Sequence, residues 1–220
     1  MRLTFRLLRV TAEATAPANQ SFDWASLPLI YFVRHGQTDW NAESRLQGQS
    51  DIDLNDFGRA QARRNGGHLS EILGDASAFQ FIASPMRRAR ETMEIVRAEL
   101  SLPPSDYTID RRLMEINFGD WQGFTYAELE ARQPGFAAMR EQDKWNIVPP
   151  GAGGESYRGL AARVQPWLRA VDRPTVCVSH GGVMRSMIWL VTHNSGDDAS
   201  HMNIPQDKIL RLQGGEFSWL

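Results

Sequence analysis

Short apolar runs alternate along the chain with longer segments in which apolar residues recur at helical spacing. The most continuous runs, which suit strands buried on both faces of a sheet, are residues 29–33, 79–83 and 175–179. Helical spacing marks the segments 55–73, 85–100, 155–171 and 183–191. Weaker strand patterns lie at 107–109 and 208–212. This alternation predicts an α/β fold, a three-layer α/β/α sandwich with a mainly parallel central sheet.

Polar residues at the start of the helical segments predict where the helices begin. Asn55 can cap the first helix and Ser84 the second, while Glu155 or Ser156 begins the third. The first helix is expected to turn four apolar side chains inward: Ala62, Leu69, Ile72 and Leu73. The segment 121–150 is rich in Trp, Phe and Met and predicts one or two short helices joined by loops.

The length of the chain favours one domain. It has 220 residues, 42% of them hydrophobic, which is enough for one sizeable core. We therefore predict a single domain over residues 29–220, preceded by an N-terminal extension over residues 1–28. The first ten residues carry three arginines and no acid, and arginine interrupts their apolar stretch too often for a signal peptide. A loosely docked tail, a transit-like segment and a start codon assigned too far upstream all stay open.

Composition narrows the classes of function. The formal net charge of −2 provides no basic field that would attract nucleic acid, so any anion site is expected to be local. The sequence contains no run of about 18 apolar residues, so no membrane-spanning helix and no membrane partner are expected. The one cysteine, Cys177, lies in an apolar strand, which predicts a buried thiol and fits a reducing, cytoplasmic location.

Polar residues follow directly after three of the predicted buried strands. Arg34-His35-Gly36 follows the first strand, Ser84 to Arg88 follows the second, and His180-Gly181 follows the third. Ligands of parallel sheets bind beyond the carboxyl ends of the strands. Two histidines and at least two arginines are therefore expected to face one crevice.

A phosphoryl group suits this crevice best. Arginine pairs with phosphate oxygens bidentately, and Arg34 and Arg88 are both expected there. Two helix N-termini, after Ser84 and at Gly181, would add backbone N–H donors. Adjacent arginines repel a cation and no carboxylate cluster is close in the sequence, so no metal is expected.

A neutral imidazole can attack a phosphorus atom held in this way. His35 is the candidate nucleophile, and His180 can stabilise charge on the transferring oxygens. The departing alkoxide needs a proton, for which Glu115 is the candidate acid. Glu115 lies between apolar residues, where burial and a bound phosphate would both favour its protonated form.

The ordered motifs of residues 29–220 resemble those of the histidine phosphatase superfamily, of the cofactor-dependent phosphoglycerate mutase type. The most specific motif is Arg34-His35-Gly36-x-Thr38-x-Trp40-Asn41. Six others follow in the family's order: Arg45-Leu46-Gln47-Gly48, Asp53-Leu54-Asn55 with Gly58, Ser84-Pro85-x-x-Arg88-Ala89-x-x-Thr92, Glu115 with Phe118-Gly119-x-Trp121-x-Gly123, Gly153-Gly154-Glu155-Ser156, and Ser179-His180-Gly181-Gly182-Val183-x-Arg185. The resemblance implies a phosphoglycerate mutase-like fold.

The same resemblance implies a role for each candidate residue. His35 would carry the phosphoryl group and Glu115 would donate the proton. The phosphate pocket would be completed by three side chains, Arg34, Arg88 and His180. Further phosphate contacts are expected from Asn41, Gln47, Gly48 and Gly181. No cofactor is needed, the expected partner is a small-molecule phosphate ester, and a homodimer stays open.

Three functions are compatible with this set of residues. In a phosphatase, water accepts the phosphoryl group; in a mutase, another hydroxyl of a retained intermediate accepts it. The resembling mutases carry paired arginines before a Pro-Pro, whereas residues 142–145 before Pro149-Pro150 lack that pair and include Asp143. This difference favours a phosphatase. A non-catalytic phospho-ligand binder is the third hypothesis, and an intact nucleophile and acid argue against it. The sequence leaves the substrate and the role of Arg45 open.

Overall fold

The computed structural model describes residues 22–220. The first 21 residues of the predicted extension lie outside this range. Within the described part, Phe22 and Trp24 pack against the core and Leu27 is buried in it. A short 3-10 helix, Trp24–Ser26, precedes the first strand and begins with a cap from Asp23.

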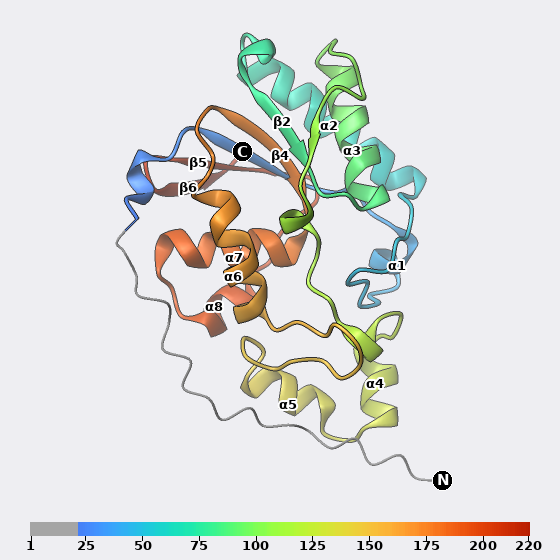
Figure 1. Ribbon diagram of the computed structural model, residues 1–220. Helices are drawn as coiled ribbons and strands as arrows, with labels where there is room; N and C mark the ends of the chain where they lie inside the picture. Colours follow the sequence, from blue (N-terminus) through green and yellow to red (C-terminus); the bar gives the residue numbers. More distant parts are fainter. Residues whose placement is uncertain (1–21) are drawn as a thin grey trace.

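The central sheet has six strands in the order β3-β2-β4-β1-β5-β6 (Figure 1). Their bounds are Ile30–Arg34 (β1), Gln80–Ala83 (β2), Thr108–Ile109 (β3), Thr175–Ser179 (β4), Ile209–Gln213 (β5) and Glu216–Trp219 (β6). Strands β1 to β4 are parallel, and β5 and β6 join the β1 edge as an antiparallel pair. The predicted mainly parallel sheet is confirmed, but the sequence did not reveal β6.

Alternate side chains of β1 point to opposite layers, as a strand buried on both faces requires. Tyr31 and Val33 belong to the apolar cluster beneath α2 (Asp56–Ile72) and α3 (Arg87–Glu99). Ile30 and Phe32 belong to the larger cluster beneath α6 (Tyr157–Leu168) and α7 (Gly181–Thr192). Figure 1 shows these two helix pairs on opposite sides of the sheet, which confirms the three-layer architecture.

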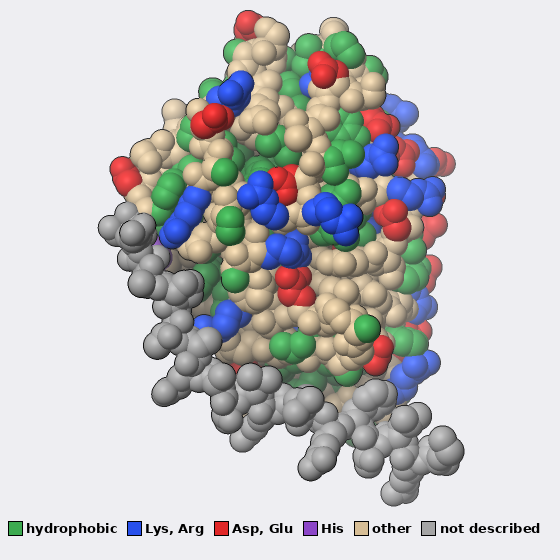
Figure 2. Space-filling view, viewed as in Figure 1, with side chains coloured by type: hydrophobic (Ala, Val, Ile, Leu, Met, Phe, Trp, Pro, Cys, Tyr) green, Lys and Arg blue, Asp and Glu red, His purple; other side chains and the backbone are tan. Residues whose placement is uncertain are grey.

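The remaining helices are shorter. Their bounds are Asp39–Ala42 (α1), Tyr126–Arg132 (α4), Phe136–Gln142 (α5) and Gly196–His201 (α8). Within residues 22–220, no helix is long and apolar enough to cross a membrane. On the face shown in Figure 2, basic and acidic side chains are interspersed.

Two of the predicted helix caps are observed and one is wrong. Asn55 caps α2 and Ser156 caps α6, each by accepting a backbone N–H with its side-chain oxygen. Helix α3 begins later than predicted, with Met86 and not Ser84 at its N-cap. Ser84 is turned instead towards the carboxyl end of β4. The predicted inward face of α2 is also wrong at Ile72, which is 36% exposed.

The segment 121–150 leaves the sheet and returns to the same place. Its ends meet where the backbone N–H of Asp120 donates to the carbonyl of Pro150 at 2.8 Å. Between them, α4 and α5 form the predicted short helices. The buried Trp145 anchors the segment, because its ring stacks on Tyr157 and contacts Trp189.

Candidate active site

The carboxyl ends of β1, β2 and β4 surround one cavity of about 240 Å³. Its walls come from these strand ends, from the loop 41–48 and from the segment 121–150. The lining includes six of the residues singled out in the sequence: Arg34, His35, Asn41, Gln47, Arg88 and Glu115. Gly48 and Gly181 line it too.

His35 lies just beyond β1 and is 2% exposed. Its Nδ1 donates to the carbonyl of Gly36 at 2.8 Å. Because a carbonyl only accepts hydrogen bonds, the proton is fixed on Nδ1 and the lone pair on Nε2. Burial lowers the pKa of His35 well below its ordinary value, and the charges of Arg88 and Arg34 lower it further. The free protein therefore holds a neutral imidazole with its nucleophilic nitrogen defined.

Arg88, in the first turn of α3, connects the nucleophile to the loop after α1. Its side chain is fully buried, and its Nε lies 3.3 Å from His35 Nε2. The two Nη groups donate to the carbonyls of Ser50 and Gly48 at 2.7 and 2.8 Å. These bonds fix the plane of the guanidinium. Burial lowers the pKa of Arg88 to about 10, so it stays cationic at neutral pH.

Arg34 is the last residue of β1, and His180 directly follows the adjacent parallel strand β4 as the N-cap of α7. Arg34 Nη1 donates to the carbonyl of Ile204 at 2.6 Å, while its buried Nε has no partner. His180 is fully buried with its ring centroid 5.1 Å from that of His35. Its Nε2 is 2.7 Å from Ser84 Oγ, and its buried Nδ1 has no partner. Within residues 22–220, these two buried nitrogens beside His35 therefore have no hydrogen-bond partner.

Burial also controls the charge of His180. It lowers the pKa of this ring well below the ordinary value, and Arg88, His35 and Arg34 add to the effect. Both histidines are consequently neutral near pH 7. A dianionic ligand would offset the repulsion from the arginines and favour proton uptake by His180.

Glu115 reaches the cavity from the stretch between the 3-10 helices Arg111–Leu113 and Gly119–Trp121. One carboxylate oxygen accepts from the N–H of Ile116 at 2.9 Å. The other accepts from the N–H of Gly182, in the first turn of α7, at 3.2 Å. Two backbone donors thus orient the carboxylate beside the N-terminus of α7.

A second group of cations lies in the same cavity, on elements other than those that hold His35. It consists of Arg140 and Lys144 from the segment 121–150 and Arg185 from α7. Arg140 is 2% exposed, and its Nε has no hydrogen-bond partner in the part of the chain that the structure describes. Burial, with repulsion from Arg185 and Arg140, lowers the pKa of Lys144 to about 8. These groups add positive charge to the cavity wall, and Arg185 is close enough to Arg34 to help lower the pKa of that guanidinium.

Comparison with known proteins identifies the family. The family model described as the histidine phosphatase superfamily (branch 1) matches residues 30–219. The chain belongs to this superfamily. It is 35% identical over 205 residues to a glucosyl-3-phosphoglycerate phosphatase of Mycolicibacterium vanbaalenii, which covers 87% of this chain and 82% of that protein.

Other relatives of this histidine phosphatase include a mutase. A 2,3-bisphosphoglycerate-dependent phosphoglycerate mutase of Methylocella silvestris is 34% identical over 170 residues, covering 74% of this chain and 81% of that protein. Among solved structures, a mycobacterial glucosyl-3-phosphoglycerate phosphatase superposes with a TM-score of 0.68 at 28% identity. The match covers 88% of this chain and 96% of that one. The predicted fold and the predicted phosphomonoester phosphatase are confirmed.

The loop residues predicted to contact phosphate in this histidine phosphatase are held in different ways. Asn41 Oδ1 accepts hydrogen bonds from Thr38 and from Gln206 Nε2, which leaves the donor group of its amide for a ligand. Gln47 is 6% exposed, and its buried Oε1 has no partner. Gly48 has a φ of +53°, and a Cβ there would lie 2.2 Å from Gln122 Oε1, so both the backbone conformation and the close contact favour glycine.

One residue at the site, Gln206, was missed in the sequence, and Ser84 has a different role from the helix cap that was predicted. Gln206 donates to the carbonyl of His35 at 2.9 Å, and Ser84 contacts His180. Neither has a local signal, because each acts through a partner distant in sequence. Arg185, which belongs to the motif beginning at Ser179, lines the cavity one helical turn after Gly181, although no role was predicted for it. Arg45, which was left open, lines the cavity and pairs with Glu43 and Glu128 at 2.6 and 2.7 Å.

Metal binding was not expected at this site. Among residues 22–220, no group of three or more His, Cys, Asp and Glu side chains could hold a metal ion. Metal-independent activity stays a prediction, and a chelator assay would test it.

Proposed function

We propose that this histidine phosphatase hydrolyses phosphomonoesters through a covalent phosphohistidine on His35. The observation that supports the proposal most directly is the fixed state of that imidazole. Its proton is held on Nδ1 by the Gly36 carbonyl, and burial keeps the ring neutral. Nε2 is therefore ready for attack without a separate general base.

In the first step, the substrate phosphate would take over the N–H of Arg88 that now contacts Nε2. This exchange frees the Nε2 lone pair, which attacks phosphorus in line with the leaving oxygen. The P–N bond forms as the P–O bond breaks. Arg34, Arg88 and His180 would stabilise the three remaining oxygens.

The leaving alkoxide takes its proton from Glu115. Glu115 must therefore bind a proton once the dianion is in place, although two backbone N–H groups orient its carboxylate in the free protein. In the second step, Glu115 accepts a proton from water as the water oxygen attacks the phosphohistidine. The P–N bond breaks, inorganic phosphate leaves, and His35 returns to its neutral form.

The direct test is trapping of the intermediate. A ³²P-labelled substrate followed by an alkaline quench should give acid-labile label on the protein, and His35→Ala should give none. Loss of the nucleophile should lower turnover by roughly a thousandfold or more. Normal turnover by His35→Ala would contradict the mechanism. The mutase hypothesis predicts a phosphorylated isomer in place of free phosphate, so both products should be measured.

We propose further that the leaving group carries a second anion. Arg140, Lys144 and Arg185 line the cavity in addition to the arginines that flank His35, and a carboxylate or phosphate would offset their mutual repulsion. The relative from Mycolicibacterium vanbaalenii is named as a phosphatase of glucosyl-3-phosphoglycerate. This compound contains a carboxylate and is the first substrate to test. Matched esters with and without a carboxylate, scored by phosphate release, would show whether the second anion matters.

Location and assembly belong to the proposal too. A cytoplasmic location is supported by a single cysteine, Cys177, that is fully buried. Cell fractionation would test it. Size-exclusion chromatography with light scattering would separate a monomer from the homodimer that the sequence left open.

A further inference from the structure

Arg163, on α6, uses all five N–H donors of its guanidinium. Nε and Nη2 donate to the two carboxylate oxygens of Glu155, at 2.9 and 2.7 Å. This is the parallel two-bond arrangement that fixes an arginine in one plane. Glu155 lies just before α6, so the pair is also set by local chain geometry. The three remaining donors are turned away from Glu155.

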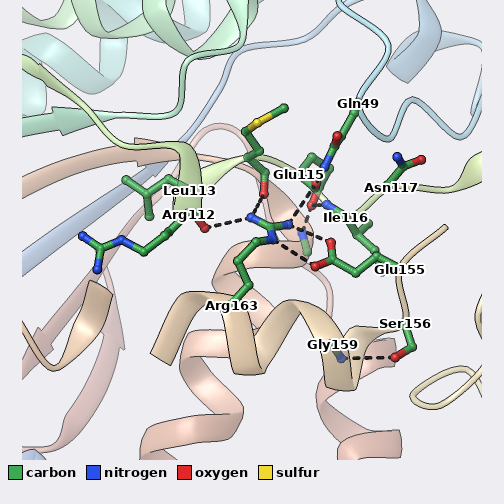
Figure 3. Close-up of polar contacts among 12 residues, drawn as sticks. Gln49, Arg112, Leu113, Glu115, Ile116, Asn117, Glu155, Ser156, Gly159 and Arg163 are labelled. Atoms are coloured by element: carbon green, nitrogen blue, oxygen red, sulfur yellow. Dashed lines mark hydrogen bonds and ion pairs between the residues drawn. The ribbon is translucent and has the colours of Figure 1, made fainter. Parts of the chain in front are cut away.

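Those three donors hold backbone carbonyls of the stretch that carries Glu115 (Figure 3). Nη1 donates to the carbonyls of Arg112 and Met114 at 2.8 and 3.0 Å, and Nη2 donates to the carbonyl of Glu115 at 3.3 Å. The intervening carbonyl, that of Leu113, accepts from Ser179 Oγ at 2.9 Å. Four successive carbonyls ending at Glu115 therefore have fixed partners.

The chain is also held at and after Glu115. Gln49 Nε2 donates to the same Glu115 carbonyl at 2.9 Å, opposite Arg163. The backbone N–H of Glu155 donates to the carbonyl of Asn117 at 2.9 Å. Because Glu155 takes part through both its side chain and its backbone, the Arg163–Glu155 pair borders the acid residue on both sides.

Arg163 does not reach the substrate cavity. It lines a separate hollow on the other side of this stretch, together with Gln49, Arg111, Arg112 and Met114. Its side chain is 24% exposed, so a shorter or more flexible cation can remain solvated there. An effect of Arg163 on catalysis would have to pass through the backbone of residues 112–115.

We propose that Arg163, oriented by Glu155, is a positioning residue that holds Glu115 at the distance and angle needed for proton transfer to the leaving group. The inference rests on the proposed role of Glu115. Proton donation depends on placement within a few tenths of an ångström, whereas attack by His35 depends on elements that Arg163 does not touch. The proposal therefore predicts a defect confined to esters that need a proton.

Arg163→Lys is the test, because it keeps the charge and removes the planar fork. Keeping the charge also preserves the small contribution of Arg163 to the lowered pKa of His180, which is caused mainly by burial. In single-turnover measurements, the rate with an alkyl phosphate should fall about tenfold to a hundredfold. The rate with p-nitrophenyl phosphate should change by about twofold or less, since this leaving group departs unprotonated.

Arg59→Lys is the matched control. Arg59 pairs with Glu91 at 2.6 Å on the far helical layer, and its loss should leave both rates unchanged. Equal loss with both esters in Arg163→Lys would overturn the proposal, because it would indicate a general structural role. Should Arg163→Lys not fold, Glu155→Gln allows the same comparison and the same two outcomes.

A double variant separates this inference from the proposed function. If Arg163 acts through Glu115, adding Arg163→Lys to Glu115→Gln should produce no further loss with the alkyl phosphate, within about twofold. Additive losses would contradict positioning through Glu115. If Glu115→Gln alone shows no preference between the two esters, the acid role itself fails. If Glu115→Gln shows the preference and Arg163→Lys does not, only the inference about Arg163 fails.

Discussion

The carboxylate of Glu115 lies against the backbone of Gly182, whose N–H donates to it at 3.2 Å. A Cβ at position 182 would stand 2.3 Å from Glu115 Oε1, closer than the two groups can approach. The proposed acid and the first turn of α7 are thus fitted to each other. Glycine at this position permits the contact, and any side chain would displace the carboxylate.

Gly182→Ala should therefore impair proton donation more than phosphoryl attack. We expect the single-turnover rate with an alkyl phosphate to fall about tenfold to a hundredfold, with a smaller loss for p-nitrophenyl phosphate. Gly67→Ala, in α2 with no atom near the added Cβ, is the matched control and should retain both rates. An unchanged alkyl phosphate rate in Gly182→Ala would mean that Glu115 acts from another position.

Glu115→Gln should depend strongly on the leaving group. A general acid is typically worth about a hundredfold to ten-thousandfold, and an activated aryl ester does not need it. The loss should be of that order for an alkyl phosphate, while phosphoenzyme formation from p-nitrophenyl phosphate should survive. Rapid-quench kinetics measure this first step separately from dephosphorylation. Equal losses for both esters would indicate that Glu115 orients phosphate or water.

Lys144 should give the enzyme a pH dependence specific to substrates with a second anion. Its pKa of about 8 means that the side chain is cationic below pH 8 and becomes neutral above it. For a phosphate ester whose leaving group carries a carboxylate, kcat/KM should fall as pH rises through 8. A phosphate ester with an uncharged leaving group should not show this fall. Lys144→Met should abolish the difference between the two pH profiles. It should also lower kcat/KM for the carboxylate ester by about tenfold to a hundredfold. The exposed Lys208→Met is the control.

The two buried histidines should make the free protein less stable in acid. Because their pKa values are lower in the folded chain than in the unfolded chain, the unfolded state binds more protons below about pH 6.5. The free energy of unfolding should decrease as pH falls from 6.5, by at most about 1.4 kcal/mol per pH unit for each histidine. Urea titrations of wild type and His35→Asn measure this. An unchanged pH slope in His35→Asn would show that the ring is protonated in the folded protein.

The parts of this structure that could be predicted from sequence are those with local causes. Apolar runs determine β1 and β4, and Asn55 caps α2 through its own side chain. Ser84 shows the limit of this reasoning. A serine before a helix usually caps it, but this one contacts His180 across the sheet, 96 positions away in sequence. Its role depends on the pairing of β2 with β4, which no local pattern encodes.

Strand β6 was missed for a similar reason. Its four residues alternate between exposed and half-buried, so they lack the continuous apolar run that marked the central strands. The turn before it, Gly214-Gly215 with both φ values positive, is the signal that could have indicated a hairpin. Around the cavity, the strand ends were predictable from their motifs, whereas Arg140 and Lys144 depend on how the segment 121–150 folds back.

Because the segment 121–150 begins and ends at the hydrogen bond between Asp120 and Pro150, it can be regarded as a cassette inserted at one point of the fold. Two of the three cations proposed to recognise the leaving group, Arg140 and Lys144, belong to the cassette, whereas Arg185 is on α7 and the nucleophile directly follows β1. Replacing this segment with the corresponding segment of another enzyme of this fold should change the substrate preference and leave phosphoryl transfer intact. Trp145 would have to be retained, because it packs the segment against α6 and α7.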